Sequence, residues 1–161
     1  MWKRSAGLGL TLLAAVTLAV SVQAQDDEPT PEELAQSATE TRQAVFKLLA
    51  FNMGPIGGMA RGQVEFDAAL AERNARRIAA LAPMIPELFA ARDTRDFDVE
   101  TEALPVIWDN MGDFQEKAAA LEEAALTFAE TASGGDRAQV LGGLRAFGST
   151  CGNCHDDFRV D

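Results

Sequence analysis

The stretch Cys151-Gly152-Asn153-Cys154-His155 lies near the end of the 161-residue chain, with only residues 156–161 after it. Two cysteines three positions apart lie on one side of a helix, where both thiols can bond the two vinyl groups of one porphyrin. A histidine that directly follows them is placed to bind the iron of that porphyrin. The C-x-x-C-H pattern therefore predicts one covalent haem c, with thioether bonds from Cys151 and Cys154 and an axial bond from His155.

Two other chemistries use cysteine pairs at this spacing. A redox-active dithiol usually follows a strand in a βαβ unit, and no such pattern surrounds residues 151–155. A zinc ion needs about four ligands, whereas the chain has two cysteines and one histidine, so carboxylates would have to complete the site. The pattern favours haem over both.

The N-terminus has the pattern of an export signal. Lys3 and Arg4 precede an apolar run over residues 6–20, and Val22-Gln23-Ala24 has the small-x-small form of a cleavage site. The run is shorter than the roughly 20 residues that span a bilayer. We therefore expect a signal peptide over residues 1–24, with an uncleaved N-terminal anchor as the alternative.

Export and composition limit the possible functions. Residues 25–161 are enough for one domain with a core of its own. Cleavage removes two positive charges and takes the formal net charge from −11 to −13, which makes nucleic acid an unfavourable partner. We expect the mature protein in the periplasm, without a membrane segment. The acidic surface suggests a basic redox partner, although such a face is usually only solvated, and the sequence does not identify that partner.

Periodic apolar residues predict four helices. The first begins near Pro31, with Thr30 as its cap, and ends at Gly54 and Pro55 before a glycine-rich loop to residue 65. The other elements are a helix capped by Asp67 and stopped by Pro83 and Pro86, an irregular connection over 83–104, a helix from about Pro105 to Ala132, and a helix from Asp136 to Phe158. The 83–104 connection is long enough to be functional or to wrap the fold.

Each helix has a stripe of residues at alternating spacings of three and four, which is the seam of a bundle helix. In the first helix the main stripe is Leu34, Ala38, Thr41, Val45, Leu48 and Asn52, and an adjacent face has Arg42, Phe46, Leu49 and Met53. In the third helix the stripe is Ile107, Met111, Phe114, Ala118, Leu121, Ala125, Phe128 and Ala132. In the last helix it is Val140, Leu144, Phe147, Cys151, Cys154 and Phe158. The attachment cysteines thus continue the seam, which predicts an all-α antiparallel four-helix bundle with a haem in its core.

The possible second ligand of the iron is also limited by the sequence. His155 is the only histidine, so two histidines of one chain cannot bind the iron. No methionine follows the motif, and a sixth ligand must come from one of the upstream methionines, among which Met53 is the best placed. The alternative is an iron that is open or shielded by a phenylalanine.

Several segments together resemble cytochrome c′, the class II c-type cytochrome family. They include Arg42-Gln43-Ala44-Val45-Phe46-Lys47-Leu48, Asn52-Met53-Gly54-Pro55, Phe66-Asp67-Ala68-Ala69, Pro105-Val106-Ile107-Trp108-Asp109 and the C-x-x-C-H motif in the last helix. The resemblance spans the mature chain. It implies a left-handed antiparallel bundle, a homodimer, and a high-spin iron with five ligands.

The resemblance also implies roles for individual residues. It places Arg42 near the haem propionates, Phe46 over the vacant iron face, and Arg159 near the proximal face. From the residues alone, two ordinary roles stay open: a solvated surface charge for Arg42 and a core aromatic for Phe46. The chain departs from the family at Gly152 and Asn153, where members often have a lysine, and Met53 keeps six-coordinate low-spin relatives possible.

Three functions are compatible with these observations. The first is a haem protein that binds NO, and CO as well, with Phe46 controlling access, because an apolar cover favours neutral ligands. The second is electron transfer through Fe(III)/Fe(II), including a low-spin form in which Met53 is a ligand. The third is a haem-free bundle whose two cysteines form a disulfide. No acid/base or nucleophile constellation accompanies the motif, so we do not expect an enzyme.

Overall fold

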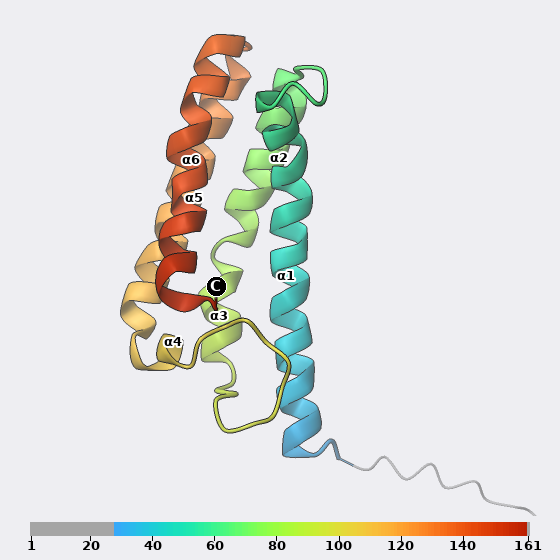
Figure 1. The fold of residues 1–161 in the computed structure, drawn as a ribbon, viewed down its shortest axis with the longest axis vertical. Helices are drawn as coiled ribbons and strands as arrows, with labels where there is room; N and C mark the ends of the chain where they lie inside the picture. The colour runs from blue at the N-terminus through green and yellow to red at the C-terminus, as the bar shows by residue number, and fades with distance from the viewer. Residues whose placement is uncertain (1–27, 161) are drawn as a thin grey trace, which may run out of the picture.

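The computed structural model describes residues 28–160 as a helical bundle (Figure 1), and the predicted signal peptide, residues 1–24, lies outside the described residues. The helices along the described chain are α1 Pro31–Ala60, α2 Ala68–Leu81, α3 Met84–Ala90, α4 Val106–Asp109, α5 Met111–Ser133 and α6 Arg137–Phe158. The long helices α1, α2, α5 and α6 alternate in direction, which confirms the predicted all-α antiparallel four-helix bundle (Figure 1).

Three of the long helices begin at the predicted caps. Thr30 Oγ1 accepts a hydrogen bond from Glu33 N at 3.2 Å, and Glu33 Oε2 accepts one from Thr30 N at 2.8 Å, a complete capping box. Asp67 and Asp136 cap α2 and α6, each accepting from the backbone N–H three residues later at 2.9 Å. These bonds satisfy donors that a helix start leaves unpaired.

The predicted seams of α5 and α6 form much of the core. In α5 and the preceding turn the buried residues are Ile107, Phe114, Ala118, Leu121, Ala125, Phe128, Ala129 and Ala132. In α6, Val140, Phe147 and Phe158 are buried, and Leu144, Cys151 and Cys154 are half-buried against them. Helix α2 packs extensively on α5, α5 on α6, and α1 on α2. A break at Asn110 divides the predicted third helix into α4 and α5.

The predicted end of the first helix was wrong. Helix α1 continues through Pro55, although a proline there removes one backbone hydrogen bond, and the turns beyond it bury Ile56 and Met59. Packing of these residues offsets the lost bond. The helix ends instead at Ala60, with Arg61 as its C-cap, and the next residue is Gly62, whose φ of 68° lies in the left-handed region that glycine tolerates. Gly62 N donates to the Met59 carbonyl, and Gln63 N donates to the Gly58 carbonyl, as in a Schellman cap.

The buried face of α1 also differs from the predicted stripe. Thr41 and Leu48 are exposed, and Leu48 keeps 49% of its surface. Arg42 is 5% exposed, although its charge suggested a place beside the stripe rather than in the core. The buried residues of α1 are Ala35, Thr39, Arg42, Val45, Asn52, Ile56, Gly58 and Met59.

The connection over residues 83–104, which we call the strap, is not fully irregular, because it contains α3. Helix α3 packs on α1 and α5, and the rest of the strap crosses the end of the bundle towards the C-terminus (Figure 1). Gln43 Nε2 of α1 donates to the Glu100 carbonyl at 2.9 Å. The strap then pairs with the end of α6, where Leu104 N donates to the Phe158 carbonyl at 2.9 Å. The strap therefore wraps the fold at the end that holds the C-x-x-C-H motif.

Among residues 28–160, no helix combines the length and apolar character needed to cross a membrane.

Two glycine substitutions should change stability in opposite directions. Gly62→Ala should lower the free energy of unfolding by about 1–2 kcal/mol, because a side chain is disfavoured at positive φ. Gly142→Ala should raise it by roughly 0.5–1 kcal/mol, because this exposed position within α6 has open space for a Cβ. Urea unfolding of the haem-loaded protein measures both. Equal effects of the two substitutions would contradict the left-handed cap at Gly62.

Candidate functional site

The two cysteines lie on the core side of α6, near its C-terminal end. Cys151 and Cys154 are free thiols, half-buried, and packed against the hydrophobic core. Burial raises the pKa of the Cys151 thiol, and it raises the pKa of the Cys154 thiol to about 11. Both thiols are therefore neutral at pH 7, and both point towards the same apolar side of the helix.

His155 follows on the same turn and is half-buried. Burial, and secondly the charge of Arg159, lower the pKa of His155 below its usual value. The imidazole is therefore neutral at pH 7, which is the form that binds a metal. Arg159 caps the helix, because its backbone N–H donates to the His155 carbonyl at 3.0 Å. Its exposed guanidinium lies 4.0 Å from a carboxylate oxygen of Glu102 in the strap.

Arg42 is buried and holds the strap. Its Nε donates to the Leu88 carbonyl at 3.1 Å, its Nη1 to Thr94 Oγ1 at 2.9 Å, and its Nη2 to the Arg92 carbonyl. Burial lowers the pKa of Arg42, and the charge of Asp93 opposes that shift. Three of the five N–H donors of this guanidinium are thus bonded within the protein, and its predicted contact with a propionate stays a prediction.

Phe46 lies one turn after Arg42 and is 38% exposed. Its ring meets Phe89 of α3 edge-on, with 6.5 Å between ring centroids. Phe89 in turn contacts Phe114 of α5 at 5.0 Å, and Phe114 contacts Phe158 of α6 at 5.2 Å. A row of aromatic rings therefore runs from α1 through the strap to the end of α6.

Met53 is half-buried and packs against the core from α1. Of the other upstream methionines, Met59 is buried and its sulfur accepts a hydrogen bond from Asp67 N at 3.5 Å, and Met84 is exposed. Met111 packs in the seam of α5. The role of Met53 as a sixth ligand stays a prediction.

The surroundings of the motif fit a flat apolar cofactor. Helices α1 and α6, which carry Phe46 and the cysteines, touch each other little, whereas the other neighbouring long helices pack closely. Two thiols, one neutral imidazole and this loosely packed side of α6 match what a haem c needs.

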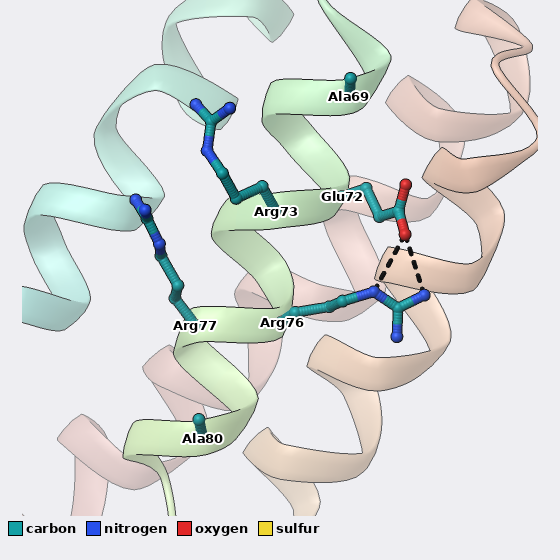
Figure 2. Close-up of a pocket in the computed structure, with 6 residues that line it drawn as sticks. All are labelled: Ala69, Glu72, Arg73, Arg76, Arg77 and Ala80. Atoms are coloured by element: carbon teal, nitrogen blue, oxygen red, sulfur yellow. Dashed lines mark hydrogen bonds and ion pairs between the residues drawn. The ribbon is translucent and has the colours of Figure 1, made fainter.

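Two other surfaces do not provide such a site. A shallow depression on α2 is lined by Ala69, Glu72, Arg73, Arg76, Arg77 and Ala80 (Figure 2). Glu72 pairs with Arg76 at 2.9 Å, while Arg73 and Arg77 extend on the side of α1 (Figure 2). It has no thiol or imidazole. Residues 28–160 also contain no group of three or more metal-binding side chains, so nothing there supports zinc.

Comparison with known proteins identifies the family. The family description cytochrome c′ matches residues 37–159, nearly the whole described chain. The chain belongs to the cytochrome c′ family. The predicted resemblance is therefore confirmed, and so is the cofactor, because proteins of this family carry covalently attached haem c. The haem-free alternative is thereby excluded.

Individual relatives agree with this assignment. Cytochrome c-554 of Cereibacter sphaeroides is 38% identical over 121 residues, 74% of this chain and 78% of the relative. The solved cytochrome c prime from Shewanella frigidimarina has a TM-score of 0.70 and 35% identity over 79% of this chain and 97% of its own. A further solved cytochrome c′, 30% identical with a TM-score of 0.67, covers 79% of this chain and 97% of its own and is described as having an unusual ligand-controlled dimer dissociation.

Sequence reasoning missed the part of the site that the strap contributes. Phe89 is buried in the middle of the aromatic row, but its segment was expected to be irregular. Trp108 Nε1 donates to the Phe89 carbonyl at 3.1 Å, a contact that no local spacing in the sequence predicts. The pattern Met84-Ile-Pro-Glu-Leu-Phe-Ala90 contained the signal, since a proline is tolerated in the first turn of a helix.

Proposed function

We propose that this protein is a periplasmic haem c protein that binds NO and CO at an iron face covered by Phe46, and that it can also transfer electrons. The proposal rests on one observation: Cys151, Cys154 and His155 lie together near the end of α6, half-buried, in a helix that touches α1 little. Cleavage after Ala24 and export supply the compartment in which such attachment occurs.

The residues of the chain have distinct roles in this proposal. Cys151 and Cys154 form the thioether bonds, and neutral His155 supplies the axial nitrogen. Bound haem c supplies an iron that changes between Fe(III) and Fe(II) and binds small neutral ligands. Phe46 limits access to the opposite face and has no hydrogen-bond donor, which favours NO and CO over more polar ligands. Arg159 lies near His155 and lowers the affinity of that imidazole for protons.

The alternative function is electron transfer with Met53 as the sixth ligand. Met53 is half-buried against the core and lies on the same face of α1 as Phe46, seven residues earlier. In that case the iron would be low-spin and closed to gases. The proposal contains no enzyme turnover.

We also propose a homodimer. On α1, Leu48 and Phe51 lie three residues apart and are 49% and 69% exposed, so two large apolar side chains face outward on one side of the helix. Ala44 and Pro55 continue the same side of the helix at spacings of four. The relative with ligand-controlled dimer dissociation supports a dimer in this family.

The attachment residues are tested by substitution. Cys151→Ser with Cys154→Ser should give a periplasmic polypeptide that loses all haem in acidified acetone, because no thioether remains. The natural protein should keep one haem per chain under the same treatment. Mass spectrometry and the reduced haem spectrum measure the result. Retention of covalent haem by the double variant would overturn the assignment of these cysteines.

The open iron face is tested by absorption spectra of the ferrous protein. The spectrum should be high-spin and should change on addition of NO, and Met53→Leu should leave it unaltered. Phe46→Ala should speed CO association by about tenfold or more, the effect of removing a barrier of roughly 1.4 kcal/mol. Phe66→Ala, at the other end of the bundle, is the control and should not change the rate. A low-spin spectrum that Met53→Leu converts to high-spin would establish the alternative.

The dimer is tested by placing a charge in the exposed surface of α1. Phe51→Glu should halve the mass found by sedimentation, because two buried carboxylates would face each other across a two-fold interface. Leu126→Glu, at a 46% exposed position of α5, is the matched control and should leave the mass unaltered. A monomeric natural protein would contradict the proposal.

A further inference from the structure

Phe89 is the residue that joins Phe46 to the rest of the protein. It is 2% exposed, and its ring lies 6.5 Å from Phe46, 5.7 Å from Trp108 and 5.0 Å from Phe114 between centroids. Offset and edge-on contacts at these distances are favourable for aromatic rings. Phe46, by contrast, is 38% exposed, and among the described residues its ring pairs with that of Phe89. Its ring position depends strongly on Phe89.

Side chains of other helices contact both the ring and the backbone around Phe89. The guanidinium carbon of Arg42 lies 4.5 Å from the centroid of the Phe89 ring, a cation–π contact. Arg42 Nε also donates to the carbonyl of the preceding Leu88 at 3.1 Å. Trp108 Nε1 donates to the Phe89 carbonyl at 3.1 Å. Helix α3 has only seven residues and no side-chain cap, so these contacts hold it in place.

Arg42 and Phe46 contact Phe89 from the same side. They are four residues apart in α1 and therefore lie one turn apart on one face. Arg42 covers the ring of Phe89, while Phe46 approaches it at an interplanar angle of 65°. A change in Phe89 thus reaches Phe46 directly, without passing through the backbone of α1.

We infer that Phe89, held by Arg42 and Trp108, is a positioning residue that keeps Phe46 across the iron face and thereby sets how fast CO and NO enter. The inference rests on the proposed function of Phe46 as the cover. It gives Arg42 a role in ligand entry that differs from contact with a propionate. The ring of Phe89 acts only through Phe46 and does not touch the ligand.

The first test is the rate of CO association after flash photolysis. Phe89→Leu keeps an apolar side chain but removes the ring contact with Phe46. It should raise the rate of CO association by about threefold to tenfold, which is the rate change that corresponds to the free energy of one edge-on aromatic contact. Phe128→Leu is the matched control, because Phe128 is also buried and pairs with Phe147 at 5.0 Å. Phe128→Leu should leave the rate of CO association unaltered. This result would show that the faster rate in Phe89→Leu is not caused by a general loosening of the core.

A double variant separates the possible failures. In the Phe46→Ala background, Phe89→Leu should have no further effect on the rate, because its action requires the Phe46 ring. If Phe46→Ala itself leaves the rate unaltered, the proposed cover fails. If Phe46→Ala is fast and Phe89→Leu is unaltered, or if the two effects multiply, the positioning role of Phe89 is overturned and the cover stands.

A second readout does not depend on ligand entry. In NMR spectra of the diamagnetic ferrous CO form, Phe89→Leu should shift the ring protons of Phe46, and Phe128→Leu should not. Arg42→Lys keeps the positive charge but loses the planar group that covers Phe89, so it should shift the same protons and raise the CO rate. If the Phe46 protons do not shift in Arg42→Lys, Arg42 does not help to position Phe89 and Phe46.

Discussion

The seam of α6 is the constraint on which the rest of the structure depends. The same side of this helix fills the core, through Val140, Phe147 and Phe158, and carries the two half-buried thiols of the C-x-x-C-H motif. The alternating spacing of three and four makes both possible, because it keeps all of these residues on one face. Helix α6 packs closely on α5 and touches α1 little.

The buried charge of Arg42 is the second element that organises this end of the molecule. A guanidinium is costly to bury unless its donors have acceptors, and here the strap supplies two carbonyls and one hydroxyl. Breaking that set would leave a buried charge without partners, which is strongly destabilising. Arg42 therefore ties the strap to α1. Since the strap also pairs with the end of α6, one bonded network connects α1 with the helix that carries His155.

The sequence predicted local features well and missed those that depend on distant contacts. The caps at Thr30, Asp67 and Asp136 and the seams of α5 and α6 are confirmed, because each depends on residues three or four apart. The stripe of α1 was partly wrong, since a pattern of apolar residues places a charged arginine at the surface. Its end was wrong because packing beyond Pro55 outweighs the single hydrogen bond that a proline removes.

The sequence by itself determined the helical class, the family and the C-x-x-C-H motif, because these can be recognised from the identity and spacing of residues within one or two turns of a helix. Only the tertiary structure decided the path of the strap, the burial of Arg42 and the place of Phe89 beside Phe46. The acceptors of Arg42 lie 46, 50 and 52 positions away along the chain. No periodicity connects residues so far apart, and they meet only because the folded bundle brings α1, the strap and α6 together at one end.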